Sequence, residues 1–289
     1  MRKIVRECLS PPISYTKPSF VMPLGACDSH SHVTPGGTWN LVEDASYEPS
    51  PAPPDESRRM RSALGFQRGV IVQASAFGQD NSGVIEALQD DPHSLRGIVV
   101  SDETLSDQRI EQLHGHGVRG MRFITSGLGG TVGTRSMVAL APRIAPFGWH
   151  VEILANSAQW PELLPILRRI PCKVVIDHLG YLPPEIGDDE PSVGAVYELV
   201  VDHGAFVKLI GYRLSEKLGN AAIVGRAQKL FRLAPDRMLW GTDWPHVGIA
   251  TPIDAGVLLN DFAGWFGNDK DVLERVLANN PAGLYQFDA

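Results

Sequence analysis

The sequence predicts an α/β fold, a (β/α)8 TIM barrel, on three observations. The chain has 289 residues, which is close to the length that one such barrel requires. Eight short segments rich in β-branched and apolar residues recur along it, and helix-like or polar stretches separate most of them. No glycine-rich phosphate fingerprint follows the first segment, which disfavours an open dinucleotide-binding sheet. Eight strands joined by right-handed crossovers therefore suit a closed barrel.

The predicted strands are nearly unbroken apolar runs, such as GVIVQAS and KVVIDHLG. Runs of this kind are typical of strands that are covered on both faces, as in a parallel sheet. The predicted strands are residues 26–32, 69–75, 95–101, 117–123, 149–155, 173–180, 205–212 and 238–246.

Helices are predicted between the strands, where apolar residues recur at spacings of three and four. Val272 with Val276 and Leu273 with Leu277 show this spacing in one of them. The candidate helices include residues 55–64, 83–89, 108–114, 161–169, 193–201 and 271–278.

We expect one catalytic barrel domain over residues 26–289, preceded by an irregular arm over residues 1–25. Prolines interrupt any periodicity in the arm. A second proline-rich stretch, residues 48–55, predicts a stiff surface loop between the first strand and its helix.

Composition narrows the range of partners. A net charge of −7 and a pI near 5.7 provide no basic field for nucleic acid or anionic lipid. No apolar run is long enough to span a membrane, and three widely spaced cysteines argue against a disulfide framework. We expect a cytoplasmic monomer or small homo-oligomer that acts on a small molecule.

Four polar side chains at predicted strand ends carry the functional hypothesis. Side chains at i and i+2 of a strand share a face, so Asp28, His30 and His32 should project together into the barrel. His178 ends another buried strand, and Asp243 ends the last one. Isolated polar groups are expensive to bury, so one convergent site at the carboxyl ends of the strands is predicted.

These residues allow two kinds of chemistry. A carboxylate among histidines can act as a general base while imidazoles stabilise an oxyanion. Alternatively, the three histidines and the aspartate could ligate one Zn²⁺. In the fifth strand we expect Leu154 at the carboxyl end, His150 at the opposite end and Glu152 between them, where it could be a buried acid.

The motifs DSHSH, VIVQASAFGQDN, GVRGMRF, GWHVE, VIDHLG, WGTDWPH and NNPAGLY occur in one characteristic order. In this the chain resembles the metal-independent 2-pyrone-4,6-dicarboxylate lactonases of the amidohydrolase superfamily (amidohydrolase-related family 2). The resemblance implies a hydrolase that opens a small carboxylated lactone, as in the catabolism of aromatic compounds. It implies that Asp243 activates water while His30, His32 and His178 polarise the carbonyl, without a cofactor.

The resemblance also implies that Ser75, Arg122 and Arg213 bind the substrate. Two positions depart from the lactonase pattern: Leu128 replaces an arginine, and Leu154 replaces an aromatic hydroxyl. These departures favour a substrate with one carboxylate, or a bulkier and less polar lactone.

Four alternatives remain open at this point. The protein could be a mononuclear Zn or Mn amidohydrolase or decarboxylase, with the metal on His30, His32, His178 and Asp243. It could be a lactone isomerase that uses the same base, or a barrel that binds a ligand without catalysis.

Overall fold

The computed structural model describes residues 6–37, 39–127, 129–130, 132–249 and 251–287. Its main sheet has eight parallel strands in the order β10-β9-β8-β7-β6-β5-β4-β2. The predicted (β/α)8 TIM barrel is therefore confirmed. The strands are β2 (Cys27–Ser31), β4 (Arg68–Val72), β5 (Leu95–Val99), β6 (Val118–Ile124), β7 (His150–Leu154), β8 (Val174–Ile176), β9 (Phe206–Lys208) and β10 (Met238–Leu239).

The chain that follows β10 closes the barrel against β2. The His32 amide donates to the carbonyl of Trp244 over 2.7 Å, and the Asp243 amide donates to the carbonyl of His30 over 2.7 Å. Gly241 permits this approach, because a Cβ at this position would lie 2.4 Å from the backbone nitrogen of His30. Closure of the barrel thus places the segment that carries His30 and His32 beside the segment that carries Asp243.

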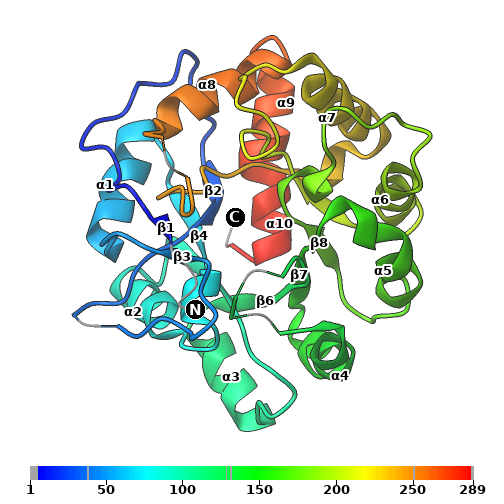
Figure 1. Cartoon of the computed structure of the whole chain (residues 1–289). Helices are drawn as coiled ribbons and strands as arrows, with labels where there is room; N and C mark the ends of the chain where they lie inside the picture. The colour runs from blue at the N-terminus through cyan, green and yellow to red at the C-terminus, as the bar shows by residue number, and fades with distance from the viewer. Residues whose placement is uncertain (1–5, 38, 128, 131, 250, 288–289) are drawn as a thin grey trace.

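Most of the helices form an outer ring around the strands (Figure 1). The helices of the described residues are α1 (Pro54–Leu64), α2 (Ser82–Asp90), α3 (Asp107–Gly115), α4 (Thr134–Ile144), α5 (Trp160–Leu167), α6 (Pro191–Val201), α7 (Ala221–Leu233), α8 (Ala255–Trp265), α9 (Lys270–Glu274) and α10 (Asn280–Tyr285). The six candidate helices correspond to α1, α2, α3, α5, α6 and α9. Helices α4, α7, α8 and α10 were not among the predicted helices. Each contains proline or glycine, and each buries apolar residues against the barrel.

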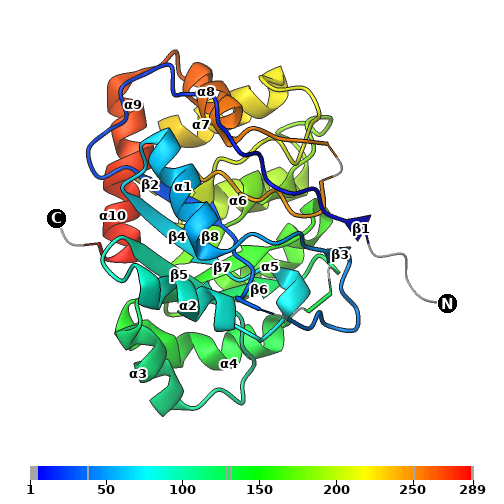
Figure 2. The ribbon, with the colours of Figure 1, turned by 90° about the vertical axis from the view of Figure 1, so that its left-hand side faces the viewer.

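One end of the barrel is filled with apolar side chains. Leu284 and Tyr285 of α10, with the following Phe287, form one buried cluster with strand residues such as Val70 and Ile98. Figure 2 shows α10 at one end of the barrel and the short strands β1 (Arg6–Glu7) and β3 (Tyr47–Glu48) at the other. Space for a ligand is therefore found at the end opposite α10.

The described part of the predicted arm runs along the outside of the barrel. Strand β1 pairs in parallel with β3, and the Tyr15 hydroxyl accepts a hydrogen bond from the Trp244 indole over 2.9 Å. The proline-rich stretch after β3 is only partly a surface loop, because Ala52 is buried and its amide donates to the Thr34 hydroxyl. Among the described residues, no helix has both the length and the apolar character needed to cross a bilayer.

Candidate active site

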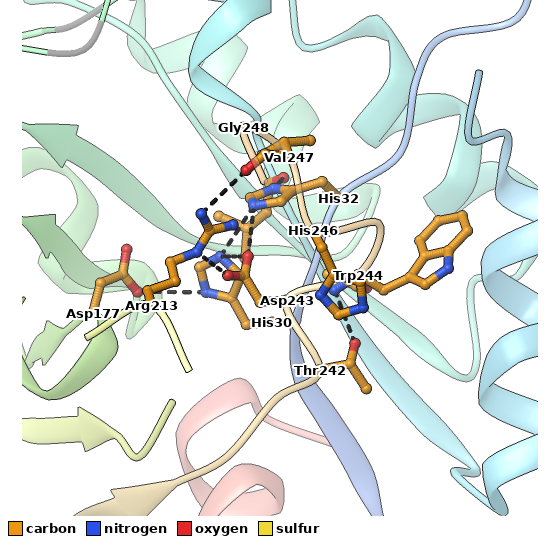
Figure 3. A network of polar contacts seen from close by, with 12 residues as sticks. His30, His32, Asp177, Arg213, Thr242, Asp243, Trp244, His246, Val247 and Gly248 are labelled. Carbon is orange, nitrogen blue, oxygen red and sulfur yellow. Dashed lines mark hydrogen bonds and ion pairs between the residues drawn. The ribbon is translucent and has the colours of Figure 1, made fainter. Parts of the chain in front are cut away.

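A cavity of about 280 Å³ lies at the carboxyl ends of the strands. Six of the seven predicted site residues line it, and the seventh, His30, is fully buried in contact with them. Figure 3 shows His30, His32 and Arg213 converging on Asp243. The described lining residues are His32, Ser46, Tyr47, Ser75, Arg122, Leu154, His178, Tyr181, Arg213, Asp243, Val247 and Gly248.

The end of strand β2 presents the histidine pair, with His30 in the strand and His32 directly after it. The Nδ1 of His32 lies 2.7 Å from the carbonyl oxygen of Val72, and a carbonyl can only accept. The proton of His32 is therefore on Nδ1, and its Nε2 faces the site. The Nε2 atoms of His30 and His32 lie 3.3 Å apart.

The expectation for Asp28 is wrong, because this residue does not point into the cavity with the histidines. Strand β2 changes register between Asp28 and Ser31, which breaks the simple alternation of side chains. The Asp28 carboxylate instead accepts hydrogen bonds from the amide and hydroxyl of Thr242, at 2.8 and 2.7 Å. Burial raises the pKa of Asp28 to about 6. Asp28 therefore ties the first strand to the segment that closes the barrel.

His178 and Asp243 lie where the backbone leaves the strands. Their φ angles are 46° and 57°, in the left-handed region that residues with a side chain rarely occupy. This explains why β8 and β10 end before the predicted limits of residues 180 and 246. Backbone strain of this kind concentrates at functional sites.

The two oxygens of Asp243 have different surroundings. Oδ2 accepts hydrogen bonds from the Tyr212 hydroxyl, at 2.7 Å, and from Nε of Arg213. Oδ1 accepts no hydrogen bond from any described residue, although Nε2 of His32 lies 3.3 Å and Nε2 of His30 lies 3.7 Å from it. Burial by itself would raise the pKa of Asp243, but Arg213 and the histidines outweigh it and hold this pKa well below its usual value. Asp243 is therefore ionised, with one oxygen available to a ligand.

Burial also keeps several imidazoles of the site neutral. It lowers the pKa of His178 to about 4 and that of His246 to about 4. The pKa of His30 is well below its usual value because of burial and the nearby charge of Lys208. Near pH 7 these rings therefore offer neutral N–H donors. His246 contacts the Tyr212 hydroxyl through Nδ1, at 3.3 Å, and so supports the group that holds Asp243.

Both predicted anchor arginines are already paired. Arg122 donates to Oδ2 of Asp177 from Nε and Nη2, at 3.1 and 2.8 Å. Arg213 binds Asp243 and donates to the carbonyl of Val247 over 3.1 Å. The third predicted anchor, Ser75, donates its hydroxyl proton to the Tyr47 hydroxyl over 3.2 Å.

A buried charged layer lies next to His30, and the sequence analysis identified only part of it. Glu152 is the buried acid that strand parity allowed, while Lys208 and Asp177 were not singled out. The Lys208 ammonium lies 2.5 Å from Oε2 of Glu152 and 3.5 Å from Oδ1 of Asp177. A lysine inside the apolar run FVKLI was the available signal, because such a charge needs buried partners. No comparable feature of the sequence marked Tyr47, Tyr181 or Tyr212 as residues of the site.

The amidohydrolase family model matches residues 27–287. This chain belongs to the amidohydrolase family. A 2-pyrone-4,6-dicarboxylate hydrolase of Comamonas testosteroni is 31% identical over 93% of each chain. A D-galactarolactone isomerase of Agrobacterium fabrum is 28% identical over 99% of this chain and 98% of its own.

A solved structure supports the same family assignment. It is from Acinetobacter baumannii, is described as a probable 2-pyrone-4,6-dicarboxylic acid hydrolase and has citric acid bound. It superposes with a TM-score of 0.83 at 26% identity, over 91% of this amidohydrolase and 100% of that chain.

Two groups of side chains in this amidohydrolase have donor atoms close enough to share a metal ion. The first is His30, His178 and Asp243, whose donor types match Zn²⁺ or Mn²⁺. The second is His30, Glu152 and Asp177, but the Lys208 ammonium already lies among these three. The second group does not fit a metal ion. Whether the first group fits depends on which nitrogen of His30 carries a proton.

One wall of the cavity is apolar. Leu154 lies at the carboxyl end of β7 and lines the cavity, as the sequence analysis expected. Leu128, the other departure from the lactonase pattern, lies outside the described residues.

Proposed function

We propose that this amidohydrolase opens a small carboxylated lactone, with Asp243 activating the attacking water. The observation that carries the proposal is the asymmetry of the Asp243 carboxylate. Oδ2 is held by Tyr212 and Arg213, whereas Oδ1 faces the histidines and accepts no hydrogen bond from a described residue. A fixed, ionised carboxylate with one available oxygen is suited to accept a proton from water. The relatives that act on lactones support this choice of substrate class.

The proposed reaction uses water and the lactone alone. Asp243 takes a proton from water as the water oxygen bonds to the lactone carbonyl carbon. The carbonyl oxygen becomes an oxyanion, which N–H groups of His30 and His178 stabilise by hydrogen bonding. When the oxyanion collapses, the ring C–O bond breaks and the proton held by Asp243 passes to the leaving oxygen. The product is the ring-opened acid.

We further propose that the substrate carries a single carboxylate. Three buried cation–carboxylate pairs surround the site, so their formal charges cancel. The described cavity wall therefore has no surplus positive charge for a second carboxylate, and Leu154 adds apolar surface. Ser75 and the outer nitrogens of Arg122 and Arg213 would bind the one carboxylate. The pairs are Arg122 with Asp177, Arg213 with Asp243, and Lys208 with Glu152.

We propose that the reaction needs no metal ion. The N–H groups of His30 and His178 supply the stabilisation of the oxyanion that a metal ion would otherwise supply. The alternative is one divalent ion, Zn or Mn, held by His30, His32, His178 and Asp243. Such an ion would polarise the carbonyl and lower the pKa of bound water.

A panel of lactones with no, one or two carboxylates tests the proposed function. We expect the highest kcat/KM for a monocarboxylated lactone, with the ring-opened acid as the product identified by NMR. No turnover of any lactone would overturn the hydrolase proposal and favour a binding barrel. The similarity to a lactone isomerase makes isomerisation the second candidate. A product that keeps a lactone ring and incorporates no oxygen from ¹⁸O-labelled water would establish it.

A further inference from the structure

We propose that Lys208 is a positioning residue that fixes the proton of His30 on Nε2. His30 then serves the site as a hydrogen-bond donor and cannot ligate a metal ion through that nitrogen. The inference concerns the site of the proposed function, but it depends only on the contacts of His30. It can therefore be tested without a substrate.

The first step is the contact between Lys208 and His30. Nζ of Lys208 lies 2.8 Å from Nδ1 of His30, and both side chains are fully buried. An ammonium group has three N–H donors and no lone pair, so Nδ1 must be the acceptor. A neutral imidazole carries one N–H, which is then on Nε2.

The second step is that two buried carboxylates surround the Lys208 amine nitrogen. Oε2 of Glu152 lies 2.5 Å from Nζ, and Oδ1 of Asp177 lies 3.5 Å from it. Both acids also approach Nδ1 of His30, but less closely, with Asp177 Oδ1 at 3.4 Å and Glu152 Oε1 at 3.7 Å. The ammonium therefore makes the shortest contact with Nδ1 and decides its role.

The third step concerns the pair of histidines at the end of β2. A metal-ligating histidine normally donates its other N–H to a carboxylate or carbonyl. His32 has this arrangement, with Nδ1 at 2.7 Å from the Val72 carbonyl. His30 has the opposite one, so its Nε2–H can donate to Nε2 of His32, at 3.3 Å, or to an oxyanion in the cavity. The two histidines are therefore a donor and an acceptor instead of two ligands, and the donor set does not fit a metal ion as it stands.

¹⁵N NMR of histidine-labelled protein tests the inference directly, because protonated and unprotonated ring nitrogens have well-separated shifts. A His30→Gln variant identifies the His30 signals. We expect wild-type His30 to be protonated on Nε2 and unprotonated on Nδ1. Protonation on Nδ1 in the wild-type protein would overturn the proposal, whatever the behaviour of any variant.

A charge-matched double variant then tests the role of Lys208. Lys208→Met combined with Glu152→Gln removes one buried cation and one buried anion together. Nδ1 of His30 should then donate to Asp177, so the proton should move from Nε2 to Nδ1. Lys229→Met, at a partly exposed lysine paired with Asp188, is the matched control and should leave the tautomer unchanged. An unchanged tautomer in the folded double variant would remove Lys208 from this role.

Zinc titration supplies a second readout that is independent of activity. Wild-type protein and the His30→Gln variant should give the same calorimetric response to ZnCl₂. One equivalent of zinc bound by the wild type and lost in His30→Gln would overturn the inference.

Discussion

Arg122 holds Asp177 with two nitrogens on a single carboxylate oxygen, at 3.1 and 2.8 Å, and both side chains are buried. The same guanidinium lines the cavity. Arg122 therefore has a structural role in the charged layer in addition to the proposed contact with substrate.

Replacing Arg122 with Gln should destabilise the protein by roughly 3–5 kcal/mol, because the buried Asp177 loses the cation that donates two hydrogen bonds to it and keeps only Lys208, at 3.5 Å. The double variant Arg122→Gln/Asp177→Asn should recover most of this loss. Urea unfolding of the three proteins measures the difference. Equal stability of the single variant and the wild type would mean that Asp177 does not depend on Arg122.

Asp243→Asn should lower kcat by about 10²–10⁴-fold, the usual contribution of a general base. Its circular dichroism should remain that of the wild type, because Tyr212 can still donate to the amide oxygen. Asp188→Asn, at an exposed aspartate paired with Lys229, is the control and should keep full activity. Near wild-type turnover by Asp243→Asn would remove Asp243 from the mechanism.

Stability should fall as the pH falls from 6.5 towards 4. The pKa of His178 and of His246 is lowered to about 4 in the folded protein, against an ordinary value of 6.5. The unfolded chain binds more protons in this range, so each histidine should reduce the free energy of unfolding by up to roughly 3 kcal/mol.

Asp28 has the opposite effect on the pH dependence of stability. Its pKa is raised to about 6 in the folded protein, so the folded protein binds this proton more tightly than the unfolded chain does. This contribution to the free energy of unfolding is lost as the pH rises towards 6. The combined effect of the two histidines on the free energy of unfolding should be larger than that of this one carboxyl group. Urea unfolding at pH 7, 5.5 and 4.5 measures the net effect, and His246→Gln should reduce the slope. Stability that increases on acidification would contradict the assignment of neutral buried histidines.

Treatment with a chelator should leave turnover unchanged, and purified protein should carry no stoichiometric zinc or manganese. Elemental analysis and activity assays before and after dialysis against EDTA measure both. Activity that is lost on dialysis and restored by one equivalent of Zn²⁺ would instead support the mononuclear-metal alternative.

Leu154→Tyr should shift the preference towards dicarboxylated lactones. A phenol at this position can donate to a second carboxylate, and a hydrogen bond to a charged group contributes about 1.5–3 kcal/mol. The ratio of kcat/KM for a dicarboxylated over a monocarboxylated lactone should rise by about 10-fold or more. Leu154→Phe is the control that adds the ring without the hydroxyl. An equal change in both variants would attribute the effect to shape.

The barrel and most of the site could be read from the sequence because both follow local rules. Unbroken apolar runs mark strands that are covered on both faces, and the carboxyl ends of those strands must meet. His30, His32, His178 and Asp243 were identified in this way. Helices α4, α7 and α8 were not predicted, and it is their packing against the barrel that stabilises them despite an internal proline or glycine.

Only the tertiary structure decided which buried polar side chains pair with one another. The change of register in β2 turns Asp28 away from the histidines, and barrel closure makes Thr242 its partner. Lys208 lies 178 residues from His30 in the chain, yet its ammonium touches the imidazole. Charge and proton positions depend on distances between strands, and no periodicity along one strand contains that information.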